Sequence, residues 1–159
     1  MRLARGTLGL AVAALLTLGG ASAAWAETPV DLGGSQLDDS AGVLSAAQET
    51  TIRDQIQSYD DSSGADVRVV FVKTFEDPSD RTGWAEATLQ NADVTGGAMV
   101  LAIATQDRNY GYYANSEFPL TEAEVQQAAE DDLQPALSKA ASSGDWSGSI
   151  SPFLTGLTS

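Results

Sequence analysis

Apolar residues along this chain follow two patterns, one typical of buried strands and one typical of helices with a single buried face. Residues 66–74 and 98–104 are nearly unbroken apolar runs, which predict strands covered by helices on both faces. Residues 109–114 follow the second run after a short polar turn, so we expect a strand that returns antiparallel beside it. Residues 28–32 predict a further short strand at an edge of the sheet.

Helical spacing is found in the segments between and after these runs. Capping boxes that begin at Ser45 and Thr121 predict two helix starts. We expect helices over residues 45–62 and 79–90 and from Thr121 onward. The apolar positions expected to be buried in the helices of the chain are Ile52, Ile56, Tyr59, Trp84, Ala85, Leu89, Val125, Ala128, Ala129, Leu133, Ile150, Phe153, Leu154 and Leu157.

The C-terminal part of the chain predicts one interrupted helix and one further helix. Pro135 lacks a backbone N–H, so it is expected in the first turn of a new helical piece rather than inside the helix that starts at Thr121. Asp145 follows a glycine and is expected to cap the last helix.

The order of these elements predicts an α/β fold. Strand 66–74, helix 79–90 and strand 98–104 form a βαβ unit, so the two strands should be parallel. The sheet is therefore expected to be small and mixed, with a parallel βαβ core and an antiparallel return strand. The tyrosines of that return strand, Tyr110, Tyr112 and Tyr113, are interpreted as packing residues rather than as a recognition stripe.

The first 26 residues have the features of a secretory signal peptide. Arg2 and Arg5 precede an apolar run over residues 6–19, and Ala24-Trp25-Ala26 is a small-residue cleavage site. We therefore expect an exported protein, secreted or membrane-anchored, whose mature chain begins at Glu27 and forms a single domain over residues 27–159.

Composition excludes several kinds of chemistry. The chain has no His and no Cys, which excludes Ser-His-Asp and Cys-His nucleophile systems, disulfides and the usual zinc sites. Removal of the two signal arginines leaves six basic side chains against 22 acidic ones. Such a surface disfavours nucleic acids as partners and attracts hard divalent cations, although solubility or adaptation to saline surroundings would also explain the acidity.

Polar residues follow both predicted parallel strands, at the edge where open α/β sheets place their ligands. Glu76 and Asp77 follow the first strand, and Asp107 and Arg108 follow the second. The carboxylates would suit Ca²⁺ or Mg²⁺, whereas Arg108 could bind a phosphate or carboxylate or simply neutralise Asp107. The alternative is that these are ordinary turn residues.

An ordered series of motifs resembles the TPM domain family. The motifs are 39–45 before the first long helix, 66–72, Trp84-Ala85, 98–104 with 107–112, Leu133-Gln134-Pro135 and 144–148. The resemblance covers a core of about 38–157. It implies a three-layer α/β/α sandwich that is exported and lies beside or tethered to a membrane, and this chain could continue beyond residue 159 into such a tether.

Members of the family are described as acid phosphatases, as Ca²⁺ or Mg²⁺ binders, or as accessory proteins of membrane complexes. The resemblance also places Asp39 and Glu122 at acidic family positions, which adds them to Asp107 as candidate metal ligands, although Asp39 could equally be a turn residue. This chain departs from the family at residues 95–97 and 115–119, and both departures weigh against phosphatase activity.

Three functions follow as hypotheses. The first is a monomeric, non-catalytic extracytoplasmic domain that binds a divalent cation weakly and contacts an unknown cell-envelope protein. The second is a metal-dependent phosphomonoesterase in which Asp39 and Asp107 hold the ion and Arg108 holds the phosphate. The third is a protein-interaction domain without a ligand.

Overall fold

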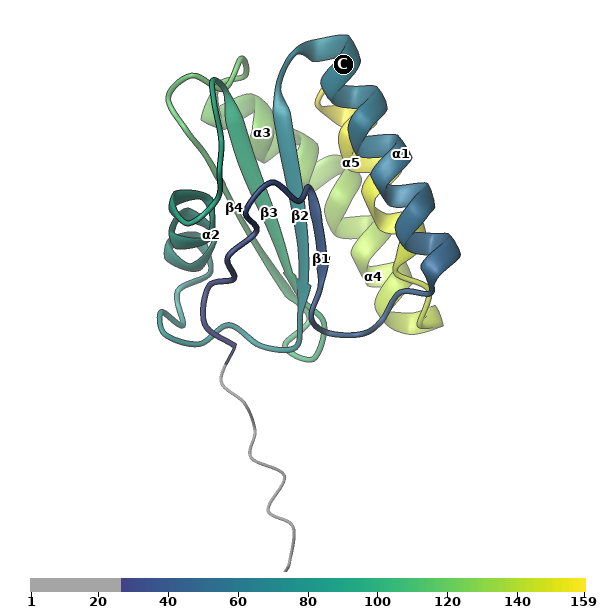
Figure 1. Ribbon diagram of the computed structural model, residues 1–159. Coiled ribbons are helices and arrows are strands. Elements are labelled where there is room, and N and C mark those ends of the chain that lie inside the picture. The colour runs from purple at the N-terminus through teal and green to yellow at the C-terminus, as the bar shows by residue number, and fades with distance from the viewer. Residues whose placement is uncertain (1–26) are drawn as a thin grey trace, which may run out of the picture.

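The computed structural model describes residues 27–159, and the predicted signal peptide lies outside them. Four strands form one sheet in the order β1-β2-β3-β4 (Figure 1). β1 pairs parallel with β2, β2 parallel with β3, and β3 antiparallel with β4. The last two of these pairings were predicted. The strands are β1 (Leu37–Asp39), β2 (Asp66–Val72), β3 (Ala98–Ala104) and β4 (Asn109–Ala114).

Helices cover the two faces of the sheet unequally. Figure 1 shows α2 alone on one face and the other four helices on the opposite face, so the predicted three-layer α/β/α sandwich is confirmed. A π-helical turn (Ala129–Leu133) joins α3 directly to α4, and a 3-10 turn (Ser147–Ser149) precedes α5. The helices are α1 (Ala46–Ser63), α2 (Arg81–Gln90), α3 (Glu122–Ala128), α4 (Gln134–Ser143) and α5 (Ile150–Gly156).

Successive side chains of the central strands point to opposite faces of the sheet, so they contribute to two separate hydrophobic cores. In β3, Met99, Leu101 and Ile103 point into the larger core with α1, α3, α4 and α5. The intervening residues of β3 are alanines and a valine, and they face α2. These small side chains leave room for Trp84, which is fully buried and packs 5.3 Å from Phe75, measured between ring centroids. That face is therefore covered by one helix together with the segment that carries Leu32.

Local signals explain where most helices start and end. Ser45 and Thr121 both form complete capping boxes, as predicted. Gly64 ends α1 with a left-handed backbone at φ 69°, which glycine adopts without steric cost. Pro135 lies in the first turn of α4, as predicted.

Two predictions about local structure are wrong. Residues 28–32 form no strand; they cover the α2 face instead, where Leu32 joins the smaller core. The edge position beside β2 is taken by β1, which pairs Leu37 with Val69. Asp145 does not cap α5: its carboxylate accepts the Ser147 N–H at 3.1 Å, in the loop that leads into the preceding 3-10 turn.

Candidate functional site

Three parallel strands end together at the lower end of the sheet in Figure 1, where the sequence predicted a site. The loops after β2 and β3 are in direct contact there. The Phe75 N–H donates to Asp107 Oδ2 at 3.3 Å, and Thr105 N–H donates to the carbonyl of Val72 at 2.8 Å. Asp107 therefore joins the two loops, although its side chain is otherwise exposed.

Asp39 lies at the end of β1 and closes the turn that leads into α1. Its Oδ1 accepts the Val43 N–H at 3.1 Å, and its Oδ2 accepts the Leu44 N–H at 2.8 Å. The Asp39 carbonyl also accepts from Gly42 at 3.0 Å. Both carboxylate oxygens thus hold backbone N–H groups, which fits the turn role that the sequence left as the alternative.

The other three residues predicted at this end, Glu76, Asp77 and Arg108, are exposed. Asp77 and Arg108 have left-handed backbones at φ 44° and 50°; Asp77 lies in a bend after β2, and Arg108 lies in the turn between β3 and β4. Within residues 27–159, the two ion pairs are Arg53–Glu49 and Arg68–Asp66, so Arg108 does not pair with Asp107. No group of three or more acidic side chains in this part of the chain is arranged to hold a metal ion.

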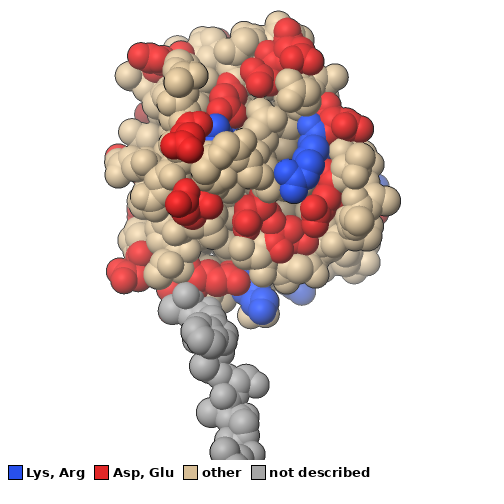
Figure 2. Space-filling model, viewed as in Figure 1, with Lys and Arg blue, Asp and Glu red and all other residues tan. Residues whose placement is uncertain are grey.

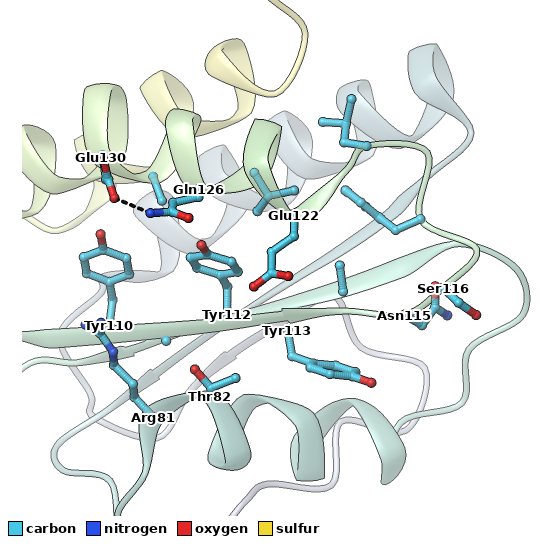
Figure 3. Close-up of a pocket in the computed structure, with 16 residues that line it drawn as sticks. Arg81, Thr82, Tyr110, Tyr112, Tyr113, Asn115, Ser116, Glu122, Gln126 and Glu130 are labelled. Atoms are coloured by element: carbon cyan, nitrogen blue, oxygen red, sulfur yellow. Dashed lines mark hydrogen bonds between the residues drawn. The ribbon is translucent and has the colours of Figure 1, made fainter.

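Glu122 lies elsewhere, in the first turn of α3 near the opposite end of β4 (Figure 3). The structure thus separates Glu122 from Asp39 and Asp107, which were predicted to share a site with it. Glu122 instead borders a cavity of about 560 Å³ that follows β4 between α2 and α3.

We call this cavity the edge groove, because β4 is the outermost strand of the sheet. A neighbouring cavity of about 620 Å³ shares Arg81, Tyr110 and Glu130 with it and continues along α4. Figure 3 shows α3 on one side of β4 and α2 on the other, with the strand between them. The side chains that define the edge groove are Arg81, Thr82, Tyr110, Tyr112, Tyr113, Glu122, Gln126 and Glu130.

Alternation along β4 gives the groove two different walls. Tyr110 and Tyr112 point toward α3 and pack against the larger core, whereas Tyr113 points toward α2 (Figure 3). α2 lies very close to the strand because Gly111 has no side chain: a Cβ there would be 2.3 Å from the Arg81 carbonyl oxygen. The Arg81 guanidinium lies 5.7 Å from the centre of the Tyr110 ring and donates to Asn109 Oδ1 at 3.1 Å.

Two carboxylates make one side of the groove electronegative. They are Glu122 on α3 and Glu130 on the π-helical turn that follows it, and we call this side the α3 wall. Burial raises the pKa of Tyr112 above its ordinary value; the charges of Tyr110, Glu122 and Glu130 raise it further, and Arg81 lowers it. For Tyr110, burial raises the pKa, Arg81 lowers it and Glu130 raises it. Glu130 accepts a hydrogen bond from the Gln126 side chain at 2.7 Å, which holds its carboxylate beside the tyrosines. This wall therefore favours a cationic group.

Sequence reasoning missed the edge groove. The interpretation of the tyrosines as packing residues is right for their contacts with the core, but Tyr110 and Tyr112 are only half-buried and their hydroxyl ends line the groove. One signal was present: no strand pattern follows β4 in the chain, so β4 has no later strand to cover its outer edge.

Comparison with known proteins identifies the family. The family model of the TPM domain matches residues 37–158 of this sequence, which include every strand and helix described above. The chain belongs to the TPM domain family. The resemblance noted from the sequence motifs is thereby confirmed.

The chain is similar to two proteins of Mycobacterium tuberculosis. UPF0603 protein MT2410 of Mycobacterium tuberculosis is 29% identical over 120 residues, which cover 75% of this chain and 17% of the relative. The UPF0603 protein Rv2345 of another strain matches to the same extent. The chain thus spans about a sixth of the length of these relatives. Within residues 27–159, no helix is long and apolar enough to cross a membrane.

Solved structures confirm the TPM fold. The N-terminal domain of the cg2496 protein from Corynebacterium glutamicum is 28% identical, with a TM-score of 0.63 and coverage of 77% of this chain and 76% of that one. An N-terminal domain from P. gingivalis is 15% identical, with a TM-score of 0.58 and coverage of 83% and 89%. The BA42 protein of Bizionia argentinensis is 16% identical, with a TM-score of 0.51 and coverage of 72% and 77%. The last two show the fold alone.

Proposed function

We propose that this TPM domain is an exported, non-catalytic binding domain that contacts a protein of the cell envelope through the edge groove. The observation that carries the proposal is the groove itself, because it combines a sheet edge to which no strand of residues 27–159 pairs, two half-buried tyrosines and two carboxylates. Tyrosine-rich concave surfaces are typical of protein-binding sites. The signal-like residues 1–26 support export.

Site-specific photo-crosslinking tests this proposal. A photoreactive residue replaces Thr82 in the groove or, as the control, Thr51 on the exposed face of α1. Both positions are exposed threonines on helices, and they differ in their distance from β4. In membranes of the source bacterium, the Thr82 position should crosslink to a discrete protein that the Thr51 position does not reach. Equal crosslinking at both positions, or none at either, would overturn the proposal.

Weak binding of a divalent cation at the strand ends is the second part of the proposal. It is supported by the exposed carboxylates there, with Asp107 held against the loop that carries Glu76 and Asp77. The described carboxylates do not form a ready-made ligand set, so any bound Ca²⁺ or Mg²⁺ would keep most of its water and bind only weakly. Asp39 would contribute little, because its oxygens already accept backbone N–H groups.

A chemical-shift titration with Ca²⁺ and Mg²⁺ tests the cation site. Amides at residues 74–77 and 105–108 should shift at millimolar ion, and Asp107→Asn should remove the shifts while Asp54→Asn on α1 leaves them unchanged. Shifts spread evenly over all acidic surfaces would mean that no specific cation site exists.

The alternative function, a metal-dependent phosphomonoesterase, requires hydrolysis of an aryl phosphate that Asp107→Ala abolishes. Hydrolysis that is absent, or that this substitution leaves intact, removes the alternative.

A further inference from the structure

The edge groove also indicates how a partner would bind, an inference that rests on the function proposed above. We infer that the groove takes an extended segment of the partner protein, bearing lysine or arginine at alternate positions, which adds to β4 as a fifth strand. Its backbone would pair with the free edge of β4, and its basic side chains would lie against the α3 wall.

The hydrogen-bond phase of the sheet leaves the outer edge of β4 available. Asn115 N–H donates to the Ala98 carbonyl at 2.9 Å, and Ala98 N–H donates back to Asn115 Oδ1 at 3.1 Å, so these two residues occupy a hydrogen-bonded position of the ladder. In an antiparallel ladder such pairs occur at every second residue. The backbone groups of Tyr113, Gly111 and Asn109 therefore face β3, in register with Val100, Ala102 and Ala104.

The backbone groups of the intervening residues, Tyr110, Tyr112 and Ala114, consequently face away from the sheet. The Tyr110 N–H behaves as expected of an outward donor, because it binds the side chain Oδ1 of Asn109 at 2.9 Å instead of β3. Tyr112 and Ala114 thus offer outward N–H and carbonyl groups along an open edge, which is the surface that strand addition uses.

The groove has room for an added strand. The cavity along β4 has a volume of about 560 Å³, and the neighbouring cavity of about 620 Å³, which continues along α4, shares Arg81, Tyr110 and Glu130 with it. An extended segment rises about 3.3 Å per residue, so six residues would match the length of β4. Figure 3 shows that α2 and α3 leave β4 accessible between them.

The two walls specify different side chains, because alternate residues of an added strand point to opposite faces. On the α3 wall, a basic side chain would meet the rings of Tyr110 and Tyr112 and the carboxylates of Glu122 and Glu130. Aromatic rings and carboxylates both bind cations. On the α2 wall, Arg81 disfavours a second cation, and Thr82 and Tyr113 suit a small or β-branched side chain.

Charge also selects the partner. The chain carries 22 acidic side chains against eight basic ones, and Figure 2 shows acidic groups spread over the face that it presents. A second copy of this chain would bring its own Glu122 and Glu130 toward the same groove, and the like charges would repel. A basic segment is therefore favoured over self-pairing.

A synthetic heptapeptide of alternating threonine and lysine provides the probe. In a titration followed by amide chemical shifts, the largest shifts should lie in β4, and the amides of Tyr112 and Ala114 should exchange more slowly with solvent. The same peptide with glutamate in place of lysine should bind at least tenfold more weakly. A peptide with alternate backbone nitrogens methylated should also bind at least tenfold more weakly, because it cannot pair with the strand.

Two variants locate the binding, and a third controls for charge. Ala114→Pro removes one outward N–H but no bond to β3, and proline is tolerated at such an edge position. Glu122→Gln with Glu130→Gln removes the acidic wall. Each should raise the dissociation constant at least tenfold. Asp54→Asn with Asp61→Asn, two exposed α1 carboxylates, makes the same change in net charge and should alter it less than twofold.

Several outcomes would overturn the inference. An equal loss of affinity in the Asp54→Asn, Asp61→Asn variant would mean that the peptide is attracted to the acidic surface as a whole and not to the groove. Unchanged affinity for the methylated peptide would mean that no strand forms, and this result does not depend on the folding of any variant. Analytical sedimentation could show a dimer that is lost in the Ala114→Pro variant. In that case the groove would be occupied by a second copy of this chain. Groove crosslinking from Thr82 that survives Ala114→Pro would leave the proposed function intact and remove only this mode of binding.

Discussion

The two acidic regions of this TPM domain use their carboxylates differently. At the strand ends, Asp39 and Asp107 accept backbone N–H groups and hold loops in place. At the edge groove, no backbone N–H within residues 27–159 donates to Glu122 or Glu130, and both carboxylates act on Tyr112. A carboxylate that closes a turn belongs to the fold, whereas one left beside an aromatic wall is available to a ligand. The acidic composition alone does not make this distinction.

The largest effect is expected where α2 meets the groove. Gly111→Ala would place a Cβ 2.3 Å from the Arg81 carbonyl oxygen, so α2 must move away from β4. We expect the free energy of unfolding to fall by about 3 kcal/mol, measured by chemical denaturation. Gly148→Ala is the matched control, because nothing lies within 4 Å of a Cβ there. Similar values for the two variants would mean that the groove does not depend on this close approach.

Asp39→Ala tests whether the strand-end carboxylates belong to the fold. Two backbone N–H groups, of Val43 and Leu44, would lose their acceptor. The expected loss is about 2 kcal/mol in the free energy of unfolding, from the same denaturation experiment. Glu122→Gln with Glu130→Gln should cost less than about 0.5 kcal/mol, since both side chains are exposed and hold no backbone group. Equal costs at the two regions would break the comparison.

Asp107→Ala is expected to have a smaller effect on stability than Asp39→Ala. Its one backbone hydrogen bond, from Phe75, is long at 3.3 Å and the side chain is exposed. We expect a loss of about 0.5 kcal/mol, together with faster hydrogen exchange at the Phe75 amide. A loss as large as that of Asp39→Ala would assign Asp107 to the fold entirely and weaken its role as a candidate cation ligand.

The smallest effect concerns pH. Burial raises the pKa of Tyr59, Tyr110 and Tyr112 above the ordinary value of 10.0, so the folded state holds these protons more tightly than the unfolded state. The free energy of unfolding should therefore be unaffected by these groups below about pH 10 and should fall as pH rises above it.

Glu122→Gln with Glu130→Gln should make that fall smaller, by a few tenths of a kcal/mol, because two charges that raise the tyrosine pKa values are gone. The measurement is the ultraviolet absorbance titration of tyrosine together with denaturation at pH 8 to 11. Asp54→Asn with Asp61→Asn should leave the titration curve unchanged. An identical curve for the groove variant would mean that Glu122 and Glu130 do not act on the tyrosines.

Most of the fold could be predicted from the sequence because its signals are local. Unbroken apolar runs, capping boxes and the position of Pro135 each act within a few residues. β1 could not be predicted, because only Leu37 of its three residues is buried and its pairing with β2 determines the strand. The wrong strand at 28–32 reflects the same limit, since an apolar residue such as Leu32 can be buried without joining a sheet.

The candidate site was less predictable because it depends on distant parts of the chain. The strand-end residues were expected from the topology, and the structure does bring Asp107 against the loop after β2. The edge groove needs α2, β4 and α3 together, and Gly111 matters only because Arg81, 30 residues earlier, lies against it. No local pattern around Tyr110 or Tyr112 contains that information.

The open edge of β4 has a consequence for colloidal behaviour. An unpaired strand edge is a template for aggregation, and proteins protect such edges with nearby charge. Glu122 and Glu130 flank this edge, and the chain as a whole carries a formal charge of −14 at pH 7. Because salt at 1 M shortens the range of charge repulsion to about 3 Å, concentrated salt weakens this protection. Purification and storage at low ionic strength should therefore keep this domain in solution longer than storage in high salt.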